Sequence, residues 1–157
     1  PGNDQLWIMV DVETSGPRYG HHSLTEIGAV AGGRHRGIVG KFEALIKPIG
    51  TAVDASRASF EAAQERGEPP EQAMKRFAAW AAPLLADGAK FIARPAAFDW
   101  PWIVHYAWTY LGENPFGFKA VCASSWFDAR GHRFHVKLPH RAVEDAAIQL
   151  EHFFSHG

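Results

Sequence analysis

The chain has very little cysteine: Cys122 is the only one in 157 residues. A single thiol can form neither an internal disulfide nor a cysteine cage for zinc, and a small buried thiol is the expected state of Cys122. Charge of either sign is not in excess, since the formal net charge is −1 at pH 7. This balance argues against a protein that coats nucleic acid by bulk charge, although it leaves room for a local basic groove.

Long apolar segments are also missing. No run approaches the roughly 18 to 20 apolar residues that cross a bilayer, and the N-terminus lacks the basic and then apolar layout of a signal peptide. We therefore expect a cytoplasmic protein with no membrane contact. The length and a hydrophobic content of 46% are sufficient for one folded domain covering residues 1–157.

The chain alternates between β-type and α-type patterns. Strands are expected at residues 6–10 and 90–93, and a hairpin at residues 26–31 and 37–46. Residues 55–85 predict two helices broken at residues 67–70, and further helices are expected at residues 100–111 and about 141–154. Residues 121–130 fit a strand or a helix. These elements predict an α/β fold with a mixed sheet and helices packed on it.

Two acidic residues stand where the first predicted strand runs into a polar turn. Asp11 and Glu13 are two residues apart, and the period of two along a strand points both carboxylates to one side of the sheet. Like charges at this spacing repel unless a cation lies between them, and hard oxygen ligands suit Mg²⁺ or Mn²⁺. Two solvated acids at the end of a strand would give the same pattern.

Further candidates lie near the middle and the end of the chain. Asp99 precedes Trp100 and Pro101 where a helix is expected to begin, and its simplest role is that of an N-cap. His140 comes five residues before Asp145, which is a rotation of roughly 140° on a helix, so the two cannot share one helical face. They can converge only if His140 lies on the loop before the last helix.

The order of these motifs resembles that of the DEDDh family of 3′-to-5′ exonucleases. The stretches that carry the resemblance are IMVDVETSG at 8–16, LTEIGAV at 24–30, AAFDWP at 96–101 and PHRAVEDA at 139–146. Each motif is weak alone, but together they span nearly the whole chain in the family's order. The resemblance implies a single-domain, RNase H-like mixed β-sheet flanked by helices.

The resemblance also implies a chemistry. Asp11, Glu13, Asp99 and Asp145 would hold two divalent ions, Mg²⁺ or Mn²⁺, and His140 would be the general base. The reaction would release nucleoside 5′-monophosphates from the 3′ end of single-stranded DNA or RNA. Two ions roughly 3.5 to 4 Å apart can stabilise both the attacking and the leaving oxygen. A neutral imidazole can take the proton of the attacking water.

Substrate contacts are expected from four more residues: Thr14, Ser15, Phe98 and Arg141. By the same resemblance, Thr14 and Ser15 would touch the terminal nucleotide, and Phe98 would meet the end of the strand; a turn and a core aromatic are the structural alternatives. Arg141 belongs to residues 129–143, which hold four basic residues and three histidines but no acid. This stretch is either a solvated loop or a phosphate-binding segment.

Two features qualify this prediction. The second motif commonly reads Ala-His-Asn, whereas this chain has Ala93-Arg94-Pro95, which keeps open a catalytically weakened nucleic-acid-binding module of the same fold. A phosphohydrolase of small nucleotides is the other alternative. The spacing of His132 and His135 could indicate zinc, but without cysteine or a third clear ligand we do not expect that metal. No motif identifies a protein partner or separates DNA from RNA.

Overall fold

Five strands form one mixed sheet in the order β3-β2-β1-β4-β5. The strands are β1 (Trp7–Thr14), β2 (Leu24–Gly33), β3 (Gly37–Leu45), β4 (Lys90–Ala93) and β5 (Ala120–Cys122). The first three are antiparallel neighbours, while β4 runs parallel to β1 and β5 parallel to β4. The computed structural model describes residues 4–156. The predicted α/β class and the β2–β3 hairpin are confirmed.

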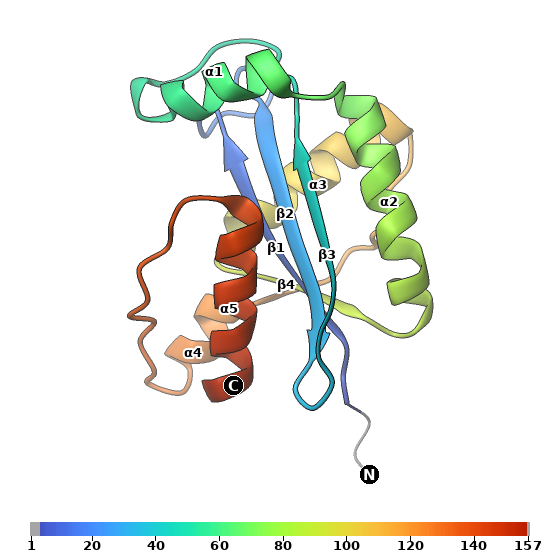
Figure 1. The fold of residues 1–157 in the computed structure, drawn as a ribbon, viewed down its shortest axis with the longest axis vertical. Coiled ribbons are helices and arrows are strands. Elements are labelled where there is room, and N and C mark those ends of the chain that lie inside the picture. The colour runs from blue at the N-terminus through green and yellow to red at the C-terminus, as the bar shows by residue number, and fades with distance from the viewer. Residues whose placement is uncertain (1–3, 157) are drawn as a thin grey trace.

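Helices cover both faces of this sheet (Figure 1). They are η1 (Asp54–Ser56), α1 (Arg57–Arg66), α2 (Pro70–Ala86), α3 (Ala96–Leu111), α4 (Ala123–Asp128) and α5 (Ala142–His156). The predicted break between two helices falls at Gly67, where the helical backbone changes to an extended one before Pro70 opens α2. Proline suits that position because the first turn of a helix needs no N–H donor there.

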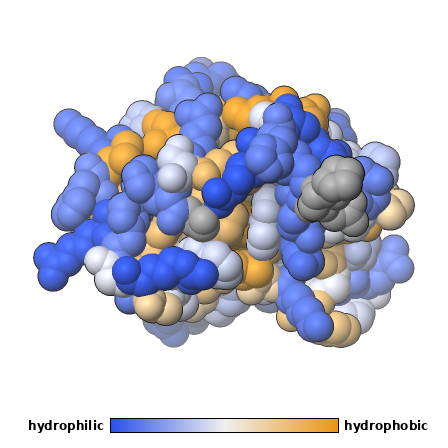
Figure 2. All heavy atoms as spheres, turned by 90° about the horizontal axis from the view of Figure 1, so that it is seen from below, coloured by the Kyte–Doolittle hydropathy of each residue, from blue (hydrophilic) through white to orange (hydrophobic). Residues whose placement is uncertain are grey.

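Two apolar clusters hold the layers together. On one face, side chains of α2 and α3 such as Phe77 and Trp102 pack against Ile8 of β1. On the other face, α5 and α4 contribute Leu150 and Phe127, which pack against the strands. The face seen from below is mainly hydrophilic, with apolar patches between the polar side chains (Figure 2). Among the described residues no helix is both long and apolar enough to cross a membrane.

Three boundaries differ from the predicted ones. The first strand continues to Thr14 instead of ending at Val10, because its backbone stays paired with β2 through the polar residues. The middle helix begins at Ala96, directly after Pro95, rather than at Trp100. Residues 121–130 contain both predicted types, since the short strand β5 passes directly into α4.

Candidate active site

The alternation of side chains along β1 creates the first part of the site. Val10 and Val12 belong to the cluster that packs against α2 and α3, whereas Met9 faces α5. Asp11 and Glu13 follow Met9 at intervals of two, so both carboxylates point to the α5 side. Asp11 is only 9% exposed, and Glu13 is half-buried. Both acids therefore lie near the end of the first strand and on one side of the sheet, as the sequence predicted.

Helix α5 faces these carboxylates with residues one turn apart. Asp145 is 2% exposed, and four residues later the Gln149 side-chain nitrogen donates a hydrogen bond of 2.9 Å to Asp11 Oδ1. Asp145 Oδ1 is buried and has no hydrogen-bond partner among residues 4–156. The neighbouring Glu144 points elsewhere, because its carboxylate lies 3.3 Å from the guanidinium of Arg141 at the surface. Only one of these two adjacent acids faces the site.

Asp99 joins the group from the first turn of α3. Its side chain is 3% exposed, and its Oδ1 accepts a 3.0 Å hydrogen bond from the backbone N–H of Val12. The predicted N-cap role is wrong, because α3 begins at Ala96 and Pro95 occupies the N-cap position. The carboxylate instead ties the start of α3 to β1, next to Asp11.

His140 lies on the loop before α5, as its sequence position required. Its backbone has a positive φ of 60°, and a turn of this kind redirects the chain into Ala142. A ring nitrogen of His140 and carboxylate oxygens of Glu13 and Asp145 all lie within 4.8 Å of one another. The structure thus brings together all five residues for which the sequence predicted a chemical role.

Burial and mutual repulsion disfavour the ionised form of the four carboxyl groups. Burial, followed by the charge of Asp99, raises the pKa of Asp11 to about 8. Burial, followed by the charge of Glu26, raises the pKa of Glu13 to about 7. The pKa of Asp99 is raised to about 7 and that of Asp145 is also raised, in both cases mainly by burial. Such a cluster favours either protons or a cation with charge greater than one.

Sequence reasoning left Gln149 and Glu26 without a role. Gln149 binds Asp11 from α5, while Glu26 Oε1 accepts a 3.1 Å hydrogen bond from the backbone N–H of Ala142 at the start of α5. Glu26 belongs to the LTEIGAV stretch, and its position two residues before Gly28 was the available signal. An added Cβ on Gly28 would lie 2.1 Å from the backbone of Ala142. Glycine thus allows α5 to approach the strand that it crosses.

Arg94 occupies the position where the sequence departs from the family pattern. Its guanidinium lies 3.6 Å from the ring centroid of Phe134, and it borders a cavity of about 280 Å³ that Arg133 also lines. Burial lowers the pKa of Arg94, while the charges of Asp11 and Asp99 act in the opposite direction. The positive charge of Arg94, directly after β4, therefore interacts with the carboxylates of Asp11 and Asp99.

The four predicted substrate contacts differ in accessibility. Phe98 is 38% exposed and Arg141 is exposed beside the site. Ser15 is fully buried, and its hydroxyl donates to Thr51 O and accepts from the N–H of Ser23. Thr14 is nearly buried and donates to Gly16 O. The hydroxyls of Thr14 and Ser15 are thus committed to the turn after β1.

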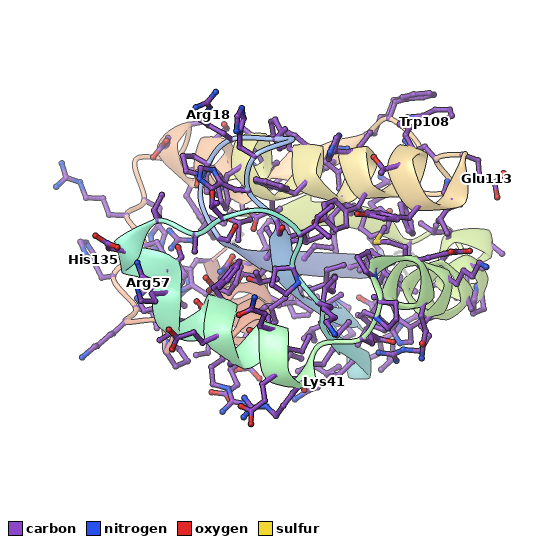
Figure 3. The ribbon with its side chains drawn as sticks, turned by 90° about the horizontal axis from the view of Figure 1, so that it is seen from above. Arg18, Lys41, Arg57, Trp108, Glu113 and His135 are labelled. Carbon is purple, nitrogen blue, oxygen red and sulfur yellow. The ribbon has the colours of Figure 1, made fainter. Side chains whose placement is uncertain are left out.

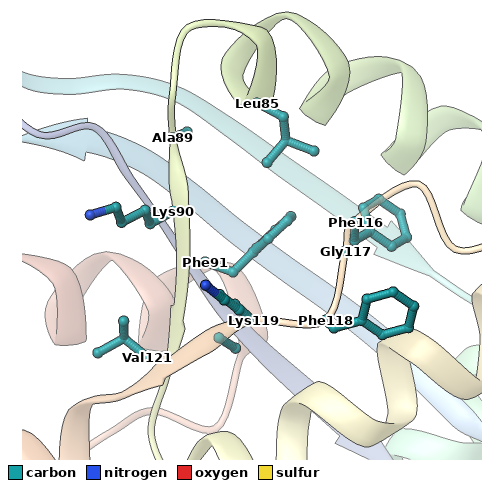
Figure 4. A pocket seen from close by; sticks show the side chains of 10 residues that line it. Leu85, Ala89, Lys90, Phe91, Phe116, Gly117, Phe118, Lys119 and Val121 are labelled. Atoms are coloured by element: carbon teal, nitrogen blue, oxygen red, sulfur yellow. The ribbon is translucent and has the colours of Figure 1, made fainter.

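The surroundings of the site are unequal in charge and polarity. Figure 3 shows Arg18, Arg57 and His135 at one end of the view, and Trp108 and Glu113 at the other end, where α3 finishes. Arg18, Arg57 and His135 therefore lie toward the end of the view at which α3 begins, with Asp99 in its first turn. A separate cavity of about 810 Å³ lies at the β5 edge, lined by mostly apolar side chains such as Phe118 (Figure 4). It contains no carboxylate and is not the site.

The sequence is similar to that of a known DNA exonuclease. The chain is 32% identical over 171 aligned residues to the 3′–5′ DNA exonuclease Cap18 of Escherichia coli, covering 95% of this chain and 90% of Cap18. No protein-family model matches the sequence.

Solved structures of exonuclease I share the fold. A product-bound exonuclease I has a TM-score of 0.61 at 13% identity, with 73% of this chain and 27% of that chain covered. Exonuclease I of Methylocaldum szegediense has a TM-score of 0.59 at 14% identity, with 71% and 25% covered. The chain thus spans about a quarter of the length of these proteins, and the likeness concerns the fold. Together with the relationship to Cap18 and the order of the motifs, it shows that the chain belongs to the DEDDh family of 3′-to-5′ exonucleases.

Proposed function

We propose that the enzyme removes nucleoside 5′-monophosphates from the 3′ end of single-stranded DNA, with two divalent ions, Mg²⁺ or Mn²⁺, held by Asp11, Glu13, Asp99 and Asp145. One observation carries the proposal. Four carboxylates from three separate elements lie close together, three of them buried and Glu13 half-buried, and an oxygen of Asp145 has no partner among the described residues. Buried like charges are costly unless cations compensate them. An all-oxygen ligand set suits Mg²⁺ or Mn²⁺.

In this mechanism the ions, when bound, neutralise charge on the phosphate and stabilise the attacking and leaving oxygens. The chain supplies the remaining steps. His140 takes a proton from the attacking water at a ring nitrogen, since it reaches toward Glu13 and Asp145 from the loop. The water oxygen bonds to phosphorus while the bond to the 3′ oxygen breaks. The products are a 5′-monophosphate and a strand one nucleotide shorter.

Arg94 fits a positioning role in this reaction. Its guanidinium carbon lies 3.6 Å from the Phe134 ring centroid, and the charges of Asp11 and Asp99 act on it, so we propose that it binds an oxygen of the scissile phosphate. Phe98, which is partly exposed at the start of α3, would contact the terminal base, and Arg141 a phosphate further along the strand. For Thr14 and Ser15 we propose contact through the backbone, because their hydroxyls already have partners.

DNA is the proposed substrate rather than RNA. The relative Cap18 is a DNA exonuclease, and exonuclease I of Escherichia coli has been crystallised with single-stranded DNA oligonucleotides such as dT13. Discrimination between the two nucleic acids depends on contacts to the 2′-OH. The test must therefore include a matched RNA.

The decisive experiment follows a 5′-labelled single-stranded DNA, a matched RNA and a dinucleotide during incubation with Mn²⁺. We expect a ladder of shortened DNA that disappears in EDTA. The Asp145→Asn variant should lose at least about a hundredfold in rate because it removes a metal ligand. Its neighbour provides the matched control, and Glu144→Gln should stay close to wild-type activity. Binding of the DNA without cleavage would contradict the proposal, as would cleavage of the dinucleotide alone.

A further inference from the structure

Three histidines outside the carboxylate site come together at the far end of α5. His152 and His156 are one turn apart on that helix, and His132 approaches them from the segment after α4. One ring nitrogen from each lies within 4.8 Å of the other two, and the Nε2 atoms of His132 and His152 are 3.0 Å apart. The ring centroids of His152 and His156 are separated by 4.3 Å. No local sequence pattern indicates this cluster, because 20 or more positions separate His132 from its partners.

The nitrogen separations are close to those of imidazoles that share one metal ion. Zinc–nitrogen bonds of about 2.0 to 2.1 Å in a tetrahedron place ligand nitrogens ~3.3 Å apart, and the Nε2 atoms of His132 and His152 are 3.0 Å apart. The His156 ring lies nearly parallel to both partner rings, so it must turn for its lone pair to reach the shared ion. Two histidines four residues apart on a helix project to the same side, and a third ligand from a loop completes such sites. A fourth position is left for water.

The environment favours the neutral form of His152, and neutral imidazole is the form that binds metal. Burial, then the charges of His156, His132 and Arg94, lowers the pKa of His152. Phe127 and Phe134 pack against the His152 ring, with centroids 5.2 and 4.5 Å away. Arg94 is the charged group from a neighbouring element that acts on the cluster, and its charge disfavours a bound cation. Affinity must therefore come from three imidazole bonds.

We propose that His132, His152 and His156 form a binding site for one divalent transition-metal ion of the zinc type, separate from the carboxylate site. Imidazole ligands select Zn²⁺, Ni²⁺ or Cu²⁺ over Mg²⁺, whereas the carboxylate cluster has the opposite preference. The two sites therefore differ in the metal that they take. The proposal does not depend on the mechanism assigned to the carboxylates.

A bound ion would attach the segment that leads to α5 to the C-terminal end of that helix through His132. Residues 129–141 join α4 to α5 and begin close to His132, while their far end carries His140. In the structure the segment contacts α5 through the ring of Phe134 on His152 and through the Arg141 carbonyl, which accepts a hydrogen bond from the N–H of Asp145. Coordination of His132 to the other end of the same helix would restrict the whole segment between the two points.

Metal binding can be measured with untagged, metal-free protein in excess Mg²⁺, by competing for Zn²⁺ with a chromophoric chelator. Wild type should retain one Zn²⁺, and His132→Gln and His156→Gln should each weaken its binding by at least about tenfold. His135→Gln is the control, since His135 lies in the same segment outside the cluster. The same titration on Asp145→Asn should still show the ion, which separates this site from the carboxylates.

Limited trypsin digestion gives a second readout. Cleavage after Arg133 and Lys137 should slow when Zn²⁺ is added to wild type, and should not change in His156→Gln. That variant is suitable because His156 is exposed in the last turn of α5, where substitution leaves the core intact. Equal Zn²⁺ affinity in wild type and His156→Gln would overturn the proposal. No retained ion in wild type would do the same.

Discussion

The positions of Asp11 and Glu13 along β1 decide on which face of the sheet their carboxylates lie. Their spacing on β1 places both carboxylates opposite α5, where Asp145 and Gln149 meet them. Moving an isolated carboxylate out of water costs several kcal/mol, and repulsion among neighbours adds to that cost. Nothing in the fold requires acids at these positions, since the same strand buries apolar residues on its other face. The cluster is therefore best explained by what it binds.

His140→Ala should separate base catalysis from metal binding. We expect turnover to fall by about 10²- to 10⁴-fold, because the attacking water loses its proton acceptor. Mn²⁺ affinity should change little, since the four carboxylates stay in place. Isothermal titration with Mn²⁺ and a single-turnover assay on the same preparation test both statements. A large loss of Mn²⁺ affinity would make His140 a ligand instead.

Arg94→Gln should lower kcat/KM on single-stranded DNA by about 10- to 100-fold, the value of one hydrogen bond to a charged group. Arg94→Lys should restore only part of the loss, because an ammonium lacks the planar group that contacts the Phe134 ring and cannot bind a phosphate through two fixed donors. Arg133→Gln serves as a control on the other side of the same cavity. If Arg94→Gln were as active as wild type, Arg94 would have only a structural role in packing against Phe134 and would not bind the phosphate.

At the scale of elements, the site depends on where α5 begins. Glu26 accepts a hydrogen bond from the first N–H of the helix, and Gly28 lets the helix backbone touch β2. His140 and Asp145 lie on either side of this contact, one before and one after the helix start. A small shift of α5 against β2 would therefore move both residues relative to Asp11.

Gly28→Ala tests this dependence. The new Cβ would lie 2.1 Å from the Ala142 backbone, so the helix must move, at a cost of about 1 to 3 kcal/mol or more in the free energy of unfolding. Exonuclease activity should fall by more than the decrease in the fraction of folded protein explains. Gly40→Ala is the matched control, because a Cβ there meets only Trp80 at an ordinary contact distance of 3.6 Å. Urea unfolding and the DNA assay on both variants distinguish the two outcomes.

The elements also show what could be predicted from the sequence. The hairpin was predicted from two β-rich runs separated by turn residues. Composition and apolar spacing predicted both helices of residues 55–85, and the last helix was also predicted. The sequence misplaced the end of β1 and the start of α3, and tertiary contacts lie at both boundaries. Glu13 stays in β1 because it pairs with β2. At the start of α3, Asp99 accepts a hydrogen bond from the backbone N–H of Val12. The roles of Gln149 and Arg94 depend on packing between distant elements, which no local pattern encodes.

At the scale of the whole molecule, the site couples folding to ion binding. Its carboxylates come from β1 near the N-terminus, α3 in the middle and α5 at the C-terminal end. Their repulsion must act against the packing of both faces of the sheet, while a cation bound among them would link all three elements. The conditions that protonate or charge these groups should therefore change the stability of the entire fold.

The metal-free protein should lose stability as the pH rises. The pKa of Asp11 is raised from 3.8 to about 8, and that of Glu13 from 4.5 to about 7, so the folded state holds these protons more tightly than the unfolded chain. A raised carboxyl pKa contributes stability that is complete below the ordinary value and is lost as the pH passes through the raised value. The decline should therefore span about pH 4 to 8.

Mn²⁺ should reverse this decline, and it should stabilise the fold more at about pH 8.5 than at about pH 5.5, where it must displace protons. Thermal unfolding in EDTA and in Mn²⁺ at both values measures the difference. The Asp11→Asn variant lacks one of the carboxyl groups with a raised pKa, so the stability of the metal-free variant should depend less on pH. Mn²⁺ should also stabilise this variant less than wild type. Equal stabilisation of wild type at both pH values would show that the ion does not bind among these four carboxylates.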